Sequence, residues 1–167
     1  SPADSTGNAI NVTGVVDITN PAAPTLTSAT YDASSTTLVV TGSNLVATAG
    51  KNNDIDISKL TLTGEGNHTY TLTSDEVELS SETAFSVILN AADQVQLDAL
   101  LNKNGSSSSD GTTYNIAAAE GWNPGAASSP ADSTGNAINV TGVVDITNPA
   151  APTLTSATYD ASSTTLV

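Results

Sequence analysis

Residues 25–41 read TLTSATYDASSTTLVVT, and this stretch indicates the fold of the chain. Two runs rich in Thr, Val and Leu, at 25–31 and 36–41, flank the turn-like segment Asp32–Ser35. Branched side chains favour extended backbone, whereas Asp and Ser favour turns. The stretch therefore predicts a β-hairpin.

The same pattern recurs at short intervals along the chain. LTLT at 60–63 and HTYTLT at 68–73 surround Gly64–Asn67 and predict a second hairpin. Further short strands are predicted at residues 76–79, 84–89, 113–118 and 136–141. About eight short strands with turn signals between them are typical of a β-sandwich, so we expect a mainly β fold.

One segment departs from the strand pattern and predicts a helix at about 91–103. Asn90 is a good N-cap, Asp93 is an acid in the first turn, and Gly105 stands where a helix stops. Leucines follow at helical spacing. We expect this helix to cap an open end or edge of the sandwich, and we favour that role over a catalytic one.

The two ends of the chain are copies of each other. Residues 1–39 are identical to residues 129–167, which gives a period of 128 residues. This period is too long for a solenoid repeat but is the length of a whole domain. The chain is therefore expected to be a window on a tandem array.

The repeat also predicts the domain boundaries. We expect the last strand of a preceding repeat at 1–13, a linker at 14–23, a complete repeat at 24–141, a second linker at 142–151, and the first hairpin of the next repeat at 152–167. Because the end segments are duplicated, the chain contains two copies of the same strand, and both can occupy the same position in the sheet. Strand exchange between molecules is therefore an open alternative.

Composition narrows the function classes. The chain is 38% hydrophobic and has no Cys, so disulfides and thiol chemistry are excluded. It has three lysines, no arginine and 17 acidic residues, for a net charge of −14. Such a charge disfavours nucleic-acid binding, which needs Lys and Arg. No apolar stretch approaches the length of a membrane span, and no signal peptide is visible in this segment.

The acidic excess indicates either simple solvation or neutralisation by a divalent cation, and we favour calcium. Asn53, Asp54 and Asp56 form the densest cluster of oxygen ligands. Carboxylates in the linkers, in the hairpin turns and before the last strand are further candidates. These candidates are Asp17, Asn20, Asp32, Asp132, Asp145 and Asp160. At each of them an ordinary turn remains the alternative.

Catalytic signals are weak. His68 is the only histidine, and neither a Ser-His-Asp triad nor a zinc site is supported. We therefore expect no enzyme. Trp122, in the loop 119–130, is the only tryptophan. It could stack on a sugar ring, although we favour a plug at one end of the core.

Three stretches carry a family resemblance. They are PTLTSATYDASSTTLVVTGSNL at 24–45, NDIDISKLTLTGEG at 53–66 and ADSTGNAINVTG at 131–142. They resemble the tandem Ig-like repeat modules of giant bacterial surface adhesins, including calcium-dependent proteins related to the RTX class. The first stretch also resembles the IPT/TIG type of Ig-like domain. The resemblance implies an Ig-like antiparallel β-sandwich and calcium binding, although the glycine-rich nonapeptide of RTX proteins is absent.

Together these observations predict a structural repeat of an extracellular bacterial adhesin or surface filament. Its partners would be neighbouring repeats, and bound calcium would stiffen the string. One alternative is a carbohydrate-binding module that recognises surface glycans through Trp122 and the loop 119–130. The other is a fibre subunit that exchanges strands. We expect no nucleic-acid partner and no membrane insertion of this segment.

Overall fold

The computed structural model describes residues 21–144 and 156–166 of the chain. The described part is mainly β, as predicted. Its strands are β1 (Thr25–Asp32), β2 (Thr37–Ser43), β3 (Leu60–Thr63), β4 (Thr69–Thr71), β5 (Leu79–Ser81), β6 (Ala84–Ile88), β7 (Asn115–Ala118), β8 (Ala137–Thr141), β9 (Tyr159–Asp160) and β10 (Thr165–Leu166). Its helices are α1 (Ala91–Leu100) and two 3-10 turns, η1 (Ile57–Lys59) and η2 (Glu65–Asn67).

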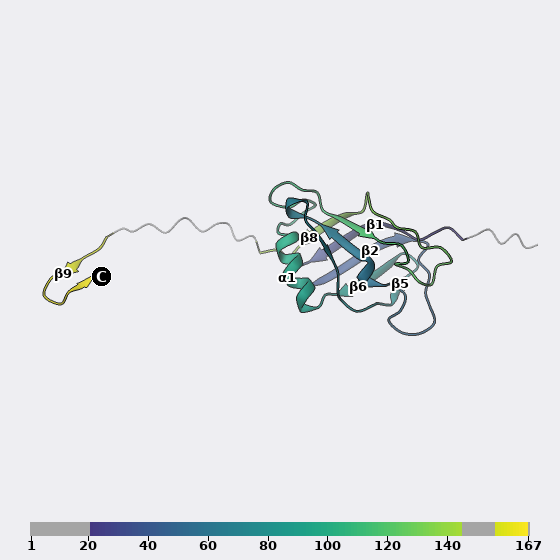
Figure 1. Cartoon of the computed structure of the whole chain (residues 1–167), viewed down its shortest axis with the longest axis horizontal. Coiled ribbons are helices and arrows are strands. Elements are labelled where there is room, and N and C mark those ends of the chain that lie inside the picture. Colours follow the sequence, from purple (N-terminus) through teal and green to yellow (C-terminus); the bar gives the residue numbers. More distant parts are fainter. Residues whose placement is uncertain (1–20, 145–155, 167) are drawn as a thin grey trace, which may run out of the picture.

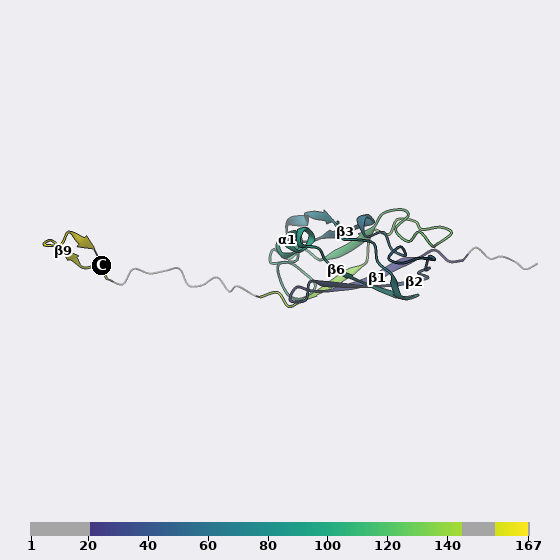
Figure 2. The same ribbon diagram turned by 90° about the horizontal axis from the view of Figure 1, so that it is seen from below.

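The first eight strands form one sheet in the order β4-β3-β7-β8-β1-β2-β6-β5. This sheet curls, so that β3 and α1 lie on one side of the body and β1, β2 and β6 on the other (Figure 2). Side chains alternate along the strands, as in β2, where Leu38 and Val40 are buried and their neighbours are not. The inward side chains, including Tyr31, Phe85 and Leu62, form one hydrophobic core.

Both predicted hairpins are present. β1 and β2 pair antiparallel up to Asp32 and Thr37, with a tight turn between them. β3 and β4 also pair antiparallel, and η2 forms their connection. These pairings are local, so the turn residues of the sequence are sufficient to indicate them.

Most strand pairs are antiparallel, as predicted, but β8 runs parallel to β1. Residues Ser28–Asp32 pair in register with Ala137–Thr141. The antiparallel expectation is wrong for this pair. The two strands are the first and the last of the sheet in sequence, so no hairpin joins them. As a result, the chain joins β1 at one end of the body and leaves β8 at the other (Figure 1).

Several element boundaries differ from the prediction, among them the ends of β4 and β7, and two of the differences concern packing. Of the strand predicted at 76–79, only Leu79 lies in a strand, as the first residue of β5. Val77 makes an isolated bridge with Ile55. The predicted helix ends at Leu100 rather than at 103. Leu101 leaves the helical conformation and is fully buried, because packing of this side chain outweighs one more helical turn. α1 contacts the edge strand β4, consistent with the expected capping role.

The duplicated hairpin offers an internal comparison. β9 and β10 pair antiparallel, with Asp160 opposite Thr165, as Asp32 lies opposite Thr37 in β1 and β2. The turn therefore forms from its own sequence. Tyr159 is 62% exposed, whereas Tyr31, its identical counterpart, is 0% exposed. Among the described residues, no helix is long and apolar enough to cross a membrane.

Candidate functional site

The end of the body where the chain leaves β8, here called the trailing end, is held firmly. Gly142 has φ 73°, and a Cβ there would lie 2.3 Å from Oδ1 of Asp32, so glycine suits this close approach. The backbone N–H of Val143 donates to the side chain of Asn104, whose amide donates back to the Val143 carbonyl, each at 3.0 Å. Val144 follows and is 82% exposed. The chain is thus fixed to the body up to Val143.

The opposite end, here called the leading end, is where Pro21–Pro24 joins β1. The side-chain amide of Asn44 donates to the Ala23 carbonyl at 3.3 Å. Just inside β1, the Leu26 amide donates to Oδ2 of Asp132 at 2.8 Å. The described part of the expected linker at 14–23 is therefore attached to the body.

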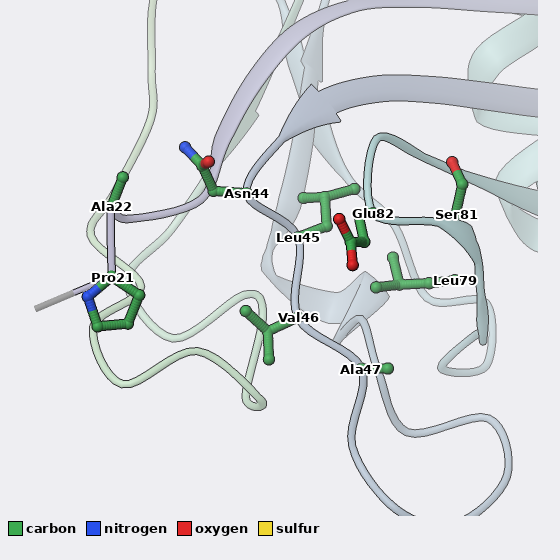
Figure 3. A pocket seen from close by; sticks show the side chains of 9 residues that line it. All are labelled: Pro21, Ala22, Asn44, Leu45, Val46, Ala47, Leu79, Ser81 and Glu82. Atoms are coloured by element: carbon green, nitrogen blue, oxygen red, sulfur yellow. The ribbon is translucent and has the colours of Figure 1, made fainter. Parts of the chain in front are cut away.

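A mostly apolar hollow of about 470 Å³ lies beside this segment (Figure 3). It is called the leading-end hollow below. Its lining residues are Pro21, Ala22, Asn44, Leu45, Val46, Ala47, Leu79, Ser81 and Glu82. Glu82 is the only charged residue among them. In a chain with a net charge of −14, this is a comparatively neutral part of the surface.

The calcium candidates Asp32 and Asp160 each organise a hairpin turn. The amide and hydroxyl of Ser34 donate to Asp32 at 3.0 and 2.6 Å, and the Ser35 hydroxyl donates at 2.9 Å. These bonds, the Ser34 hydroxyl first, lower the pKa of Asp32. The equivalent serine bonds lower the pKa of Asp160 to about 2. Both carboxylates thus have a local structural role.

The cluster Asn53, Asp54 and Asp56 is divided between two roles. Asp54 is buried and accepts from the backbone amides of Thr48 and of Leu79, the latter at 2.9 Å. Asp56 is half-buried and is the N-cap of η1, where it accepts from neighbouring groups. Asn53 donates to a nearby backbone carbonyl. The two carboxylates therefore fix different segments of backbone.

Asp132 connects the segment before β8 to the start of β1. Besides the Leu26 amide, it accepts from the side chain of Asn136 at 3.0 Å. Of the remaining candidates, Asp17, Asn20 and Asp145 lie outside the described residues. Within 21–144 and 156–166, no three acidic or histidine side chains gather as a metal site would require. Calcium binding by the described candidates therefore stays a prediction.

The most elaborate polar site was not among the predicted candidates. Asp93 is fully buried in the first turn of α1. It accepts from the amide and hydroxyl of Ser74 at 2.9 and 2.6 Å, from the Thr73 hydroxyl at 2.7 Å and from the Tyr70 hydroxyl at 2.9 Å. Burial raises the pKa of Asp93, but the bonds from Ser74, Thr73 and Tyr70 together lower it below its ordinary value.

The sequence holds a signal for this site. Asp93 stands four residues before Leu97 and seven before Leu100, on the helix face that the core buries. An acid at such a position needs several donors. Asp93 anchors α1 to the segment after β4.

A second unpredicted cluster joins two surface loops. Asp110 accepts from the amide of Gly66 at 2.9 Å, and Glu65 accepts from the amide of Asp110 at 3.1 Å. Hydrogen bonds, the Ser108 hydroxyl first, lower the pKa of Asp110. The cluster fixes the connection between β3 and β4 against the loop before β7.

Trp122 is a core residue. Its ring is 0% exposed, and its indole N–H donates to the Pro130 carbonyl at 3.2 Å. The neighbouring Asn123 is also buried, and its side chain bonds to the backbone of Val46 and of Asp54. The ring therefore offers no face to a sugar, and the plug role that the sequence favoured agrees with its position.

Comparison with known proteins gave one match. A family model described as the LVIVD repeat matches residues 11–32 and 139–160. Each segment is 22 residues long, and the two are copies one period apart. No curated protein and no solved structure matches the chain. Because the matched segments make up about a quarter of the chain, the match identifies a repeated motif that runs from the end of β8 into the next first strand.

Proposed function

We propose that this chain is a structural repeat in a tandem array and works as a spacer. The observation that supports this most directly is the parallel pairing of β1 with β8. An inserted or side-by-side domain commonly has its two chain ends close together. Here the ends lie at opposite ends of the body (Figure 1), so each repeat adds its own length to the string.

The minimum added length follows from the register. Thr25 begins β1, and Asp32 at its other end is level with Thr141, the last residue of β8. Seven residue steps of extended strand span roughly 23 Å at about 3.3 Å each. Each repeat therefore advances the chain by at least this distance along the strand direction.

The second copy of the first hairpin supports the array. Tyr159 is exposed there, whereas the identical Tyr31 is buried by the rest of a complete repeat. The LVIVD-repeat match spans the same junction and supports the repeat assignment.

The finer parts of the proposal rest on the family resemblance. We propose that the curled sheet is a variant of the Ig-like sandwich and that the array belongs to an extracellular adhesin or surface filament of a bacterium. The large acidic excess suits a long, soluble, extended polymer, because like charges keep neighbouring strings apart.

Calcium is a separate part of the proposal. The described carboxylates are already engaged by protein donors, so a stiffening ion would depend on the linker residues Asp17, Asn20 and Asp145. Oxygen ligands at a junction would join the end of one repeat to the start of the next. The spacer function does not depend on calcium binding, so the two are tested separately.

Small-angle X-ray scattering on chains of two, three and four repeats tests the spacer function. We expect the maximum dimension to increase linearly with repeat number, by at least roughly 23 Å each. Growth with the cube root of repeat number would indicate a collapsed cluster and would contradict the proposal. A mass that rises with concentration would instead favour strand exchange.

The same chains test calcium. If the linker carboxylates bind it, EDTA should lower the melting temperature by several degrees and broaden the distribution of dimensions. Identical melting curves in calcium and in EDTA would remove calcium from the account. Asp145→Asn at every junction is the matched variant, because it should reproduce the EDTA result in the presence of calcium.

A further inference from the structure

The leading-end hollow is preformed. Part of its lining is the segment after β2, and hydrogen bonds hold this segment to two other parts of the chain. The Leu45 amide donates to the Glu82 carbonyl at 3.1 Å. The Val46 amide donates to the side-chain oxygen of Asn123 at 2.9 Å, and the Asn123 amide donates back at 2.8 Å. Its shape is therefore set by the body of the repeat.

The hollow also borders the junction. Pro21 and Ala22, the first described residues of the repeat, form one of its walls, opposite Leu79 and Glu82 (Figure 3).

The trailing end presents a matching apolar group. Val144 is one of four large hydrophobic side chains that are strongly exposed within the described part of the chain. It directly follows Val143, which is bonded to Asn104 and packs against the core. An exposed valine beside a chain exit is well placed for contact with the next repeat.

The sequence limits how far apart these two surfaces can be. In the sequence, Pro149 is the copy of Pro21, the residue that lines the hollow in the described repeat. It comes six residues after Val143, where the chain is still fixed to the first repeat. Six residues span at most about 22 Å when fully extended. The trailing end of one repeat and the hollow of the next are therefore always close, at a high effective concentration.

We propose that the leading-end hollow is the docking site for the trailing end of the preceding copy of this repeat, with Val144 as its apolar contact. The contact is head-to-tail, so it uses two different surfaces and does not close on itself. Burial of apolar surface on both sides would hold the joint in one geometry. This inference rests on the proposed tandem array and specifies what limits bending within it.

Cysteine cross-linking tests the joint, because the chain has no native cysteine. A two-repeat chain carries Val144→Cys in the first repeat and Val46→Cys in the second. The control pairs the same Val144→Cys with Val95→Cys in the second repeat, which is 67% exposed on α1 and away from the hollow. Intramolecular disulfide formation in a glutathione buffer is followed on non-reducing gels.

We expect the hollow pair to cross-link at least ten times faster than the control pair. Adding Ala47→Asp to the second repeat places a charge in the hollow at an exposed position and should remove the difference. Ala92→Asp, also at an exposed position, should leave it unchanged. Equal rates for the two pairs, or a difference that Ala47→Asp leaves unchanged, would overturn the docking proposal. A string that lengthens linearly with repeat number but shows equal rates would retain the spacer function, with a joint held by other contacts.

Discussion

At the scale of single residues, two buried tyrosines differ in how their hydroxyls are satisfied. Tyr114 donates to the Lys103 carbonyl and accepts from the Lys103 amide, each at 3.1 Å. Tyr31 is equally buried, but its hydroxyl has no hydrogen-bond partner within the described residues. Burial, together with the nearby charges of Asp98 and Asp32, raises the pKa of Tyr31 to about 12. An unpaired buried hydroxyl lowers stability.

We therefore predict opposite effects of two identical substitutions. Tyr31→Phe should stabilise the repeat by about 1 kcal/mol, because it removes an unpaired polar group. Tyr114→Phe should destabilise it by about 1 kcal/mol, because two hydrogen bonds are lost. Urea unfolding followed by tryptophan fluorescence measures both. A clear loss of stability in Tyr31→Phe would show that its hydroxyl has a partner.

At the scale of elements, short-range contacts were predictable from the sequence and long-range ones were not. The turn after β1 depends on Asp32 and its next three residues, and its copy at Asp160 makes the same bonds. The N-cap of α1 is equally local, since Asn90 accepts from the Asp93 amide at 2.8 Å. Such bonds can be inferred from residue types and spacing.

The distant partners of the polar residues could not be inferred from the sequence. Asp132 accepts from Leu26, 106 residues away, and Asp54 accepts from Leu79, 25 residues away. A carboxylate that satisfies backbone amides cannot be told from a metal ligand by sequence alone. The parallel pairing of β1 with β8 also joins segments more than a hundred residues apart, so no turn signal indicates it.

Asp93→Asn should destabilise the repeat by about 2 kcal/mol or more, because an amide cannot accept from all the donors that surround this side chain. The pKa of Asp93 is lowered from 3.8 in the folded state, so its contribution is complete above that pH and is lost as the pH falls through the lower folded value. The gap between the two proteins should therefore be constant at neutral pH and shrink in acid. Asp98→Asn, exposed on the same helix, should change stability by less than about 0.5 kcal/mol. A pH-independent gap in urea unfolding would mean that the charge of Asp93 is not involved.

At the scale of the whole molecule, one stretch of chain contains the complete folded body. Residues 21–144 include the eight-stranded sheet, α1 and the clamped segments at both ends. The predicted boundary at residue 141 omits Gly142 and Val143, which pack against the β1–β2 turn and the core. The remaining described hairpin, at 156–166, forms a sheet of its own.

Truncation tests this boundary. A chain of residues 21–144 should melt within about two degrees of the full chain, because the sheet and the core are intact. A chain of residues 21–136 lacks β8 and with it Ile138 and Val140, which are buried, so it should not unfold cooperatively. Differential scanning calorimetry of the two chains measures this. A cooperative transition in the shorter chain would show that β8 is dispensable.

The parallel alignment of the first and last strands also determines how a repeat responds to force. In the proposed array, tension would pull β1 and β8 in opposite directions along their common axis. The bonds of the five paired residues in each strand are then loaded in shear and must yield together, rather than peel apart one after another. A repeat with this geometry resists stretching most strongly along the direction in which its neighbours pull.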